Sequence, residues 1–251
     1  MKKLMAANWK MYKTVDQGVA TAQELVRLLA GRLPSDREVL LCPPFTMLEG
    51  VSRVLADAPG CSTGAQNFYP AAQGAFTGEI APDQLLALGC TFALAGHSER
   101  RHIMGESDEF VGQKVAFGLA AGLKMILCIG ETIAQRRAGQ VEDVLERQLE
   151  AGLSGGLGAA TAENLAVAYE PVWAIGTGEV AGPAEILSAH ACVRDKLKAM
   201  LPAQADQVRI LYGGSVKPDN AATIIRLDNV DGVLVGGASL KADSFSQIVL
   251  A

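Results

Sequence analysis

Short apolar runs recur along the chain and alternate with longer segments in which apolar residues follow a helical spacing. A continuous apolar run, without alternation of polar residues, is typical of a strand that is buried on both faces. We expect strands at residues 4–7, 39–42, 62–65, 92–95, 125–129, 165–169, 208–212 and 233–235. The pattern therefore predicts eight strands in a sheet that is covered on both sides.

The segments between these runs have the periodicity of amphipathic helices. The first interval has apolar residues at positions 15, 19, 22, 26 and 29. In the fifth interval, one helix face is expected to carry Val141, Val144, Leu145, Gln148 and Leu149. Strict alternation of strand and helix predicts a parallel α/β sheet. Either an open, doubly wound sheet or a closed (β/α)8 barrel has this pattern.

We favour the single-domain barrel, with residues 1–251 as one domain, because the strand count is eight and the first strand is not followed by GxGxxG. In such a barrel, the residues that carry chemistry lie just after the strands. Polar residues follow four of the predicted strands, namely Asn8 with Lys10, Gln66 with Asn67, His97 with Glu99, and Glu170. The pattern therefore predicts one polar site at the mouth of the barrel.

Residues 168–178, AYEPVWAIGTG, combine a carboxylate at a strand end with an apolar segment and two glycines. Glu170 ends the strand, Pro171 stops it, and Gly176 and Gly178 enclose Thr177 at the far end of the segment. A carboxylate removes a proton from carbon efficiently only where water is excluded, and a closing loop excludes water. The segment predicts a general base beneath a lid; a solvated Glu170 on a surface turn is the alternative.

Two glycine pairs, YGGSV at residues 212–216 and VGGAS at 235–239, follow the seventh and eighth strands. Glycine lets the backbone approach an anion, and free N–H groups at a helix start bind phosphate without arginine. One such pair is ordinary turn chemistry. Two pairs at these loops predict a phosphate site, where such barrels commonly have one.

His97 directly follows the fourth strand, and Ser98 and Glu99 are suited to begin a helix. Helix N-terminal amides favour a neutral imidazole, which can donate a hydrogen bond to a carbonyl oxygen. Lys10 could face a phosphate and a developing oxyanion. The alternatives are a structural imidazole for His97 and a solvated surface side chain for Lys10.

Other ionisable residues are assigned lesser roles. We expect Glu99 and Glu131 to form ion pairs or to orient other groups. Cys128 is expected to be a small buried apolar residue, and His102 and His190 are expected to be structural or exposed.

Composition excludes several functional classes. The 251 residues are 49% hydrophobic with a net charge of -5, and the absence of Lys/Arg blocks argues against nucleic acid or a membrane surface as a partner. Five scattered cysteines without a CxxC pair suggest neither a zinc site nor a disulfide framework, so we expect reduced thiols and a cytoplasmic location. The sequence contains no apolar run of 18 residues, so we expect no membrane span.

Taken together, these motifs are similar to those of the triosephosphate isomerases. The similarity runs nearly end to end, through NWKM at 8–11, PPF at 43–45, GAQN at 64–67, GAFTGE at 74–79, GHSERR at 96–101, CIGE at 128–131, AYEPVWAIGTG, YGGSV and LVGGASL at 234–240. The resemblance implies a TIM barrel that interconverts dihydroxyacetone phosphate and D-glyceraldehyde 3-phosphate through an enediolate, in glycolysis and gluconeogenesis, without metal or organic cofactor.

The resemblance also implies a role for each site residue. Glu170 corresponds to the base, His97 to the neutral electrophile and Lys10 to the electrostatic catalyst. Substrate binding is implied for Asn8, Lys10, Gly176, Ser215, Gly236 and Gly237, and a supporting role for Glu99 and Cys128.

Members of this family are typically homodimers in which the third loop inserts into the neighbouring subunit. The loop from Gly74 to Glu79 matches it, with Thr77 as the expected contact. The chain departs from the family pattern at Tyr12 and Lys13, where we expect a small polar pair, and at residues 81–83, where Pro82 nevertheless suits a helix start.

Two alternatives differ from this interpretation. Another phosphate-binding barrel, such as a sugar-phosphate isomerase or a synthase of amino-acid biosynthesis, would share the two glycine loops, but it would not explain Lys10, His97 and Glu170 together with the lid. An inactive scaffold could keep the fold, because fold does not fix function; the presence of every expected catalytic residue argues against it.

Overall fold

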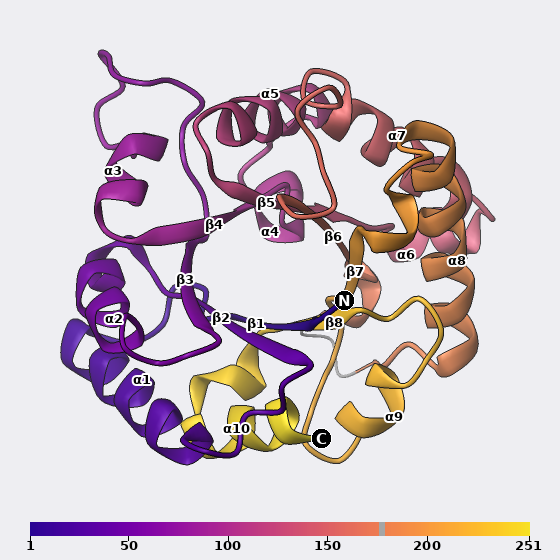
Figure 1. Ribbon diagram of the computed structural model, residues 1–251. Helices are drawn as coiled ribbons and strands as arrows, with labels where there is room; N and C mark the ends of the chain where they lie inside the picture. The colour runs from indigo at the N-terminus through magenta and orange to yellow at the C-terminus, as the bar shows by residue number, and fades with distance from the viewer. Residues whose placement is uncertain (176–178) are drawn as a thin grey trace.

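Eight parallel strands form a closed barrel in sequence order in the computed structural model, which describes residues 1–175 and 179–251 (Figure 1). Each strand pairs with the next along the chain, and β8 closes the barrel against β1. The strands are β1 (Lys3–Asn8), β2 (Arg37–Cys42), β3 (Cys61–Ala65), β4 (Cys90–Ala95), β5 (Lys124–Ile129), β6 (Leu165–Tyr169), β7 (Arg209–Tyr212) and β8 (Gly232–Val235).

All eight predicted strands are present, and the predicted bounds of β6 match the observed ones. The prediction was wrong at Val208, which precedes β7. The Val208 N–H donates to the carbonyls of Gln204 and Ala205 in the preceding 3₁₀ turn, so it makes a turn rather than a sheet hydrogen bond.

Helices surround the barrel and cover the outer face of the strands (Figure 1). They are α1 (Val15–Leu29), α2 (Leu48–Leu55), α3 (Pro82–Ala87), α4 (Ser98–His102), α5 (Asp108–Ala120), α6 (Ile133–Arg137), α7 (Val141–Leu153), α8 (Pro183–Met200), α9 (Ala221–Ile225) and α10 (Ala242–Leu250). Short 3₁₀ turns add η1 (Phe45–Met47), η2 (Val172–Ala174), η3 (Ala205–Gln207) and η4 (Gly237–Leu240). As expected, α3 begins at Pro82, whose fixed φ suits the first helical position.

Two layers of apolar side chains hold the barrel together. Along each strand, alternate side chains point inward and outward. The inward set fills the barrel with Leu4, Ala6, Leu40, Cys42, Phe92, Leu94, Ile126, Cys128, Ala166, Ala168, Leu211 and Leu234. The outward set packs against the helices, so the strands are buried on both faces, as their unbroken apolar runs predict.

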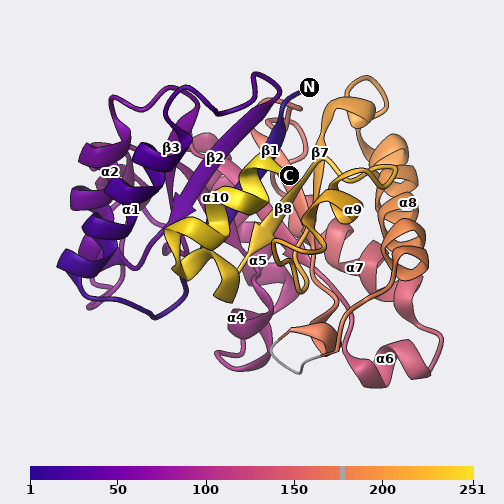
Figure 2. The same ribbon diagram turned by 90° about the horizontal axis from the view of Figure 1, so that it is seen from below.

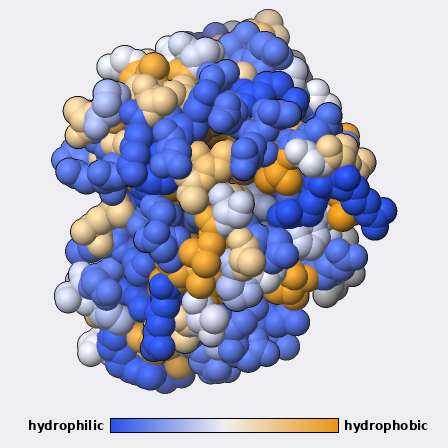
Figure 3. All heavy atoms as spheres, turned by 90° about the vertical axis from the view of Figure 1, so that its right-hand side faces the viewer, coloured by the Kyte–Doolittle hydropathy of each residue, from blue (hydrophilic) through white to orange (hydrophobic). Residues whose placement is uncertain are grey.

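The outer faces of the helices are mainly polar. On the side of the molecule that carries α7 and α8, the surface is mostly hydrophilic with small apolar patches (Figure 3). Among the described residues, no helix has both the length and the apolar character needed to cross a membrane.

The strands share one direction, so their carboxyl ends meet at one end of the barrel. In a side view, α4 and α6, which follow β4 and β5, lie at the end opposite the chain's N-terminus (Figure 2). Side chains that follow different strands are thereby brought together, although they lie far apart in the sequence.

Candidate active site

A cavity of about 750 Å³ opens at the carboxyl ends of the strands. Its lining includes many of the polar residues and glycines that the sequence singled out: Asn8, Lys10, His97, Glu170, Gly213, Gly214, Ser215, Gly236 and Gly237. The predicted convergence at the barrel mouth is confirmed for these residues.

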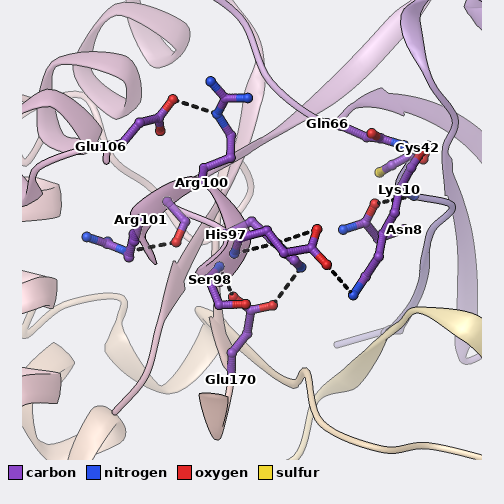
Figure 4. A network of polar contacts seen from close by, with 12 residues as sticks. Asn8, Lys10, Cys42, Gln66, His97, Ser98, Arg100, Arg101, Glu106 and Glu170 are labelled. Carbon is purple, nitrogen blue, oxygen red and sulfur yellow. Dashed lines mark hydrogen bonds and ion pairs between the residues drawn. The ribbon is translucent and has the colours of Figure 1, made fainter. Parts of the chain in front are cut away.

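Glu170 directly follows β6 and is only 2% exposed. One carboxylate oxygen, Oε2, accepts a hydrogen bond from the Ser98 N–H at 2.9 Å, and Oε1 lies 2.9 Å from His97 Nε2 (Figure 4). The side chain has room because Gly213 lies beside it: a β-carbon there would lie 2.8 Å from Glu170 Cγ. In this arrangement the carboxylate is held at the start of α4, where the helix dipole favours a negative charge.

His97 is the residue at the N-cap of α4, and it is 6% exposed. Its Nδ1 accepts a hydrogen bond from the Glu99 N–H at 3.3 Å. Because Nδ1 accepts, the ring proton of the neutral imidazole is on Nε2, which therefore donates toward Glu170. The helix that was expected to begin after His97 is present, and it fixes this tautomer.

The neighbouring charges set the acidity of His97. Burial lowers the pKa of the imidazole, but the adjacent carboxylates of Glu170 and Glu99 outweigh burial and raise the pKa above its ordinary value. The raised pKa therefore belongs to the arrangement in which Glu170 lies against the ring.

Lys10 has a left-handed backbone, with φ of 50°, a conformation that is costly for a residue other than glycine. Polar contacts hold both of its peptide groups. The Lys10 N–H donates to Asn8 Oδ1 at 2.9 Å, and the Lys10 carbonyl accepts from Gln66 Nε2 at 2.9 Å (Figure 4). The ammonium pairs with Glu99 Oε1 at 2.7 Å, so Lys10 is a half-buried ion-paired residue rather than a solvated one.

Gln66, predicted at the barrel mouth, and Ser98, predicted at a helix start, make polar contacts whose partners the sequence did not reveal. The Gln66 amide also donates to the Cys42 carbonyl at 2.8 Å, and it thus ties the ends of β1, β2 and β3 together. Its position after the third strand was the available signal. The contribution of Ser98 is a backbone N–H, which no side-chain motif reveals.

The two glycine turns form one side of the cavity. A β-carbon at Gly236 would lie 3.3 Å from Lys10 Cε, and one at Gly237 would meet no atom within 4 Å, so the turn leaves open space above its backbone. The Ser215 hydroxyl donates to the Ala174 carbonyl at 3.2 Å, which links the seventh loop to η2. Gly176, the remaining predicted phosphate contact, lies outside the described residues.

Cys128 and Glu131 have the surroundings that the sequence predicts for a small buried residue and an ion-pairing residue. Cys128 is fully buried inside the barrel, and burial raises the pKa of its thiol, so it behaves as a small apolar side chain. Glu131 is also fully buried, and its Oε1 accepts from Trp173 Nε1 at 2.8 Å and pairs with Arg136 Nε at 3.1 Å. Within residues 1–175 and 179–251, no group of three His, Cys, Asp or Glu side chains is arranged to hold a metal ion.

Acid–base side chains beside two glycine turns, all at the strand ends of a closed barrel, define the class of barrel enzymes that act on phosphorylated compounds. The sequence model of one family in this class, described as triosephosphate isomerase, matches residues 3–251. The chain therefore belongs to the triosephosphate isomerase family.

Individual relatives agree with this assignment. The chain is 60% identical to the triosephosphate isomerase of Nitratidesulfovibrio vulgaris strain DP4 over 100% of both chains, and 49% identical to that of Chloroflexus aurantiacus over 98% of this chain and 97% of the relative. Its fold is similar to the crystal structure of triosephosphate isomerase from Bartonella henselae, with a TM-score of 0.89 and 37% identity over 99% of this chain and 98% of that one.

Triosephosphate isomerase interconverts dihydroxyacetone phosphate and D-glyceraldehyde 3-phosphate, a step of glycolysis and gluconeogenesis that needs no cofactor.

Proposed function

We propose that Glu170 is the base that moves a proton between the two carbons of the triose, and that His97 polarises the substrate oxygens. One observation carries the proposal: a buried carboxylate lies 2.9 Å from Nε2 of a buried imidazole, in the same cavity as the two glycine turns. The substrate carbonyl already acidifies the adjacent C–H bond, so one carboxylate and one hydrogen-bond donor suffice.

Glu170 must leave its present partners before it can act. It now accepts from the Ser98 N–H and lies against His97 Nε2, so its oxygens are occupied. On substrate binding, we propose that the carbonyl oxygen takes the place of the carboxylate at Nε2, and Glu170 turns toward the carbon. The carboxylate beside the ring is then replaced by a neutral group, so a main cause of the raised His97 pKa is removed and the imidazole acts as a neutral donor.

Lys10 and Asn8 are proposed to bind the substrate from the end of β1. The Lys10 ammonium is held by Glu99 at 2.7 Å in the cavity, close to the turn at Gly236. From there a positive charge stabilises both the phosphate and the negative charge that develops on the enediolate oxygen. Glu99 orients the ammonium, which is the supporting role expected for it.

The phosphate is proposed to bind between the seventh and eighth loops, at Ser215, Gly236 and Gly237, with Gly176 of the lid as a further contact. These turns need no cationic side chain, since backbone N–H groups of a glycine turn favour an anion, and in the eighth loop they lie at the start of the 3₁₀ turn η4. The lid also keeps water from the enediolate, which would otherwise eliminate its phosphate.

We further propose a homodimer formed through the loop from Gly74 to Glu79, with Thr77 as a contact. Exposed apolar side chains support an interface: Met11 is 94% exposed and Tyr12 is 55% exposed after β1, and Phe76 of the third loop is also exposed. Large exposed apolar side chains of this kind are typical of contact with a partner. Tyr12 lines the cavity as well, so the interface would adjoin the active site.

One barrel domain spanning residues 1–251 and a cytoplasmic location complete the proposal. The family model covers nearly all of the chain, and the five cysteines are all free. Free thiols are usual in a reducing compartment.

Proton NMR with dihydroxyacetone phosphate in D₂O tests the mechanism. We expect rapid formation of glyceraldehyde 3-phosphate with deuterium entering at carbon, because the transferred proton exchanges with solvent on the base. Exchange without isomerisation would keep Glu170 as a base and reject the role of His97 or the lid. Folded protein that gives neither signal would support an inactive scaffold or another phosphate-binding barrel.

A further inference from the structure

Gln148 is a polar residue on the apolar face of α7, next to the buried Leu145 and Leu149. It is only 3% exposed. A buried amide is unfavourable unless it is hydrogen-bonded. The side-chain oxygen Oε1 of Gln148 accepts a hydrogen bond at 2.8 Å from the N–H of Gly130, the residue that directly follows β5.

The backbone of Gly130 lies directly against the backbone of Glu170. A β-carbon at Gly130 would lie 1.7 Å from the Glu170 carbonyl oxygen, so no side chain fits between them. The N–H of Glu170 donates to the carbonyl of Ile129 at 2.8 Å. The backbone of the proposed catalytic base therefore contacts Ile129 and Gly130, and Gln148 hydrogen-bonds to Gly130 from helix α7.

Glu131, the next residue of this segment, contacts the first residues of the proposed lid. Its carbonyl accepts from the Val172 N–H at 3.1 Å, and its carboxylate accepts from Trp173 Nε1 at 2.8 Å. The segment from Ile129 to Glu131 thus contacts both Glu170 and η2, the 3₁₀ turn that follows it.

Helix α7 is positioned by close packing on the outside of the barrel. One turn beyond Gln148, a β-carbon at Gly152 would lie 2.6 Å from Leu127 Cδ2, so the helix lies close against β5. It also packs against α5 and α8, outside the barrel (Figure 1). Because α7 is closely packed, the position of Gln148 is fixed, and its hydrogen bond restrains Gly130.

We infer that Gln148 is a positioning residue for the reaction: through Gly130 it fixes the backbone of Glu170 and the start of the lid, without touching substrate. This inference rests on the proposed role of Glu170 as the base. Its physical basis is that a displacement of a reacting group by about 1 Å can cost about 10²-fold in rate.

Gln148→Met tests the inference, because methionine has a similar size and shape but offers no comparable hydrogen-bond acceptor. We expect kcat to fall about tenfold or more while KM changes less than about twofold, since most of the proposed binding groups, at Asn8, Lys10, Ser215, Gly236 and Gly237, lie on other loops. Leu149→Met, on the same helix and equally buried, is the matched control for packing and is expected to leave kcat within about twofold. Thermal unfolding of both variants checks that they are folded.

Gln148→Glu keeps an oxygen acceptor at the same reach, and it is expected to recover most of the kcat lost in the methionine variant. Fluorine NMR of protein labelled with fluorotryptophan reports on η2 directly, because Trp173 is one of two tryptophans. We expect the Trp173 resonance to shift in Gln148→Met and to stay in place in Leu149→Met. A resonance that also stays in place in Gln148→Met would contradict the link to the lid.

Equal kcat values for the two methionine variants, or a loss confined to KM, would overturn the inference. Glu170→Asp, measured in the same assay, separates this failure from failure of the proposed function. If Glu170→Asp loses turnover as expected while Gln148→Met behaves like its control, only the role of Gln148 is wrong. If Glu170→Asp keeps full turnover, the proposed base is wrong.

Discussion

At the scale of single residues, the charged side chains of the site are hydrogen-bonded or ion-paired to one another before substrate binds. Glu170 is held by Ser98 and His97, and Lys10 is held by Glu99. Each contact satisfies a buried or half-buried charge, which would otherwise be costly. We propose that bound substrate replaces the contacts of Glu170, whereas the ion pair between Glu99 and Lys10 remains and orients the ammonium.

Glu170→Asp shortens the side chain by one methylene and withdraws the carboxylate from the substrate carbon. Because the rate of proton transfer depends on close approach, we expect turnover to fall by about 10²- to 10³-fold with the fold intact. Steady-state kinetics and circular dichroism measure the two properties. Full turnover in a folded variant would contradict the assignment of the base.

His97→Gln removes the imidazole that is proposed to donate to the enediolate oxygen. The contact strengthens in the transition state, so we expect kcat to fall about 10²-fold and KM to change much less. Initial rates over a range of substrate concentrations separate the two constants. A change in KM alone would make His97 a substrate-binding residue only.

His190 contributes to stability through its own titration. Burial and the neighbouring Arg194 lower its pKa to about 4, against a hydrogen bond with the Asn229 carbonyl that raises it. The unfolded chain therefore binds a proton that the folded chain does not, between the ordinary pKa of 6.5 and about 4. Stability from His190 is complete above pH 6.5, and we expect about 3 kcal/mol to be lost as the pH falls to 4.

His190→Gln is the comparison that isolates this effect, since glutamine does not titrate and can still donate to Asn229. The free energy of unfolding, measured by denaturant titration at fixed protein concentration from pH 4 to 7.5, should fall less steeply with acid in the variant. Parallel curves for the two proteins would show that His190 does not titrate in this range.

At the scale of elements, the ends of β5 and β6 are joined more tightly than the ladder alone requires. Beyond the last paired residues, Gly130 lies against the Glu170 backbone, and Gly213 fits beside the same glutamate from the seventh loop. Glycine is required at both positions for close approach rather than for an unusual φ. The position of the base is therefore determined by backbone contacts between three consecutive loops.

Gly130→Ala should push apart the ends of β5 and β6, because the added carbon would lie 1.7 Å from the Glu170 carbonyl oxygen, which cannot rotate away. We expect a loss of about 2 kcal/mol or more in stability, together with a large fall in kcat. Gly158→Ala is the control: its β-carbon would meet no atom within 4 Å, so we expect stability to be unchanged or slightly higher. Melting temperatures and initial rates of both variants test the contrast.

At the scale of the whole molecule, the exposed apolar residues Met11, Tyr12 and Phe76 predict that the working protein is an assembly. Met11 and Tyr12 directly follow Lys10, which lines the cavity. A partner that covered this surface would restrict the loop that carries Lys10, so assembly and catalysis are expected to depend on one another.

Thr77→Arg places a large charged side chain in the loop that is proposed to enter the partner. We expect analytical ultracentrifugation to show a shift from dimer toward monomer, and kcat/KM to fall by about tenfold or more because buried interfaces tolerate an unpaired charge poorly. Gln207→Arg, an exposed change of the same charge near the start of β7, should leave both properties unchanged. A wild-type protein that sediments as a monomer would reject the proposed dimer.

Most of the architecture could be predicted from the sequence because buried parallel strands have unbroken apolar runs, and all eight were found. Strand ends were less certain: Val208 is apolar like its neighbours, but its N–H belongs to the turn before β7. The position of Glu170, His97 and Lys10 at the mouth of the barrel could be predicted because each follows a strand. Gln148 could not, because a glutamine on a helix face does not show which backbone group it will meet.

The sequence by itself determined the alternation of strands and helices, the residues at the mouth of the barrel, and the helix start after His97, since these follow from local periodicity and position along the chain. Only the tertiary structure decided that Glu170 lies on His97, that Gln66 holds the left-handed Lys10, and that Gln148 supports Gly130. Those contacts join residues 18 to 73 positions apart. Closure of the barrel, rather than any local preference, brings them within hydrogen-bond distance.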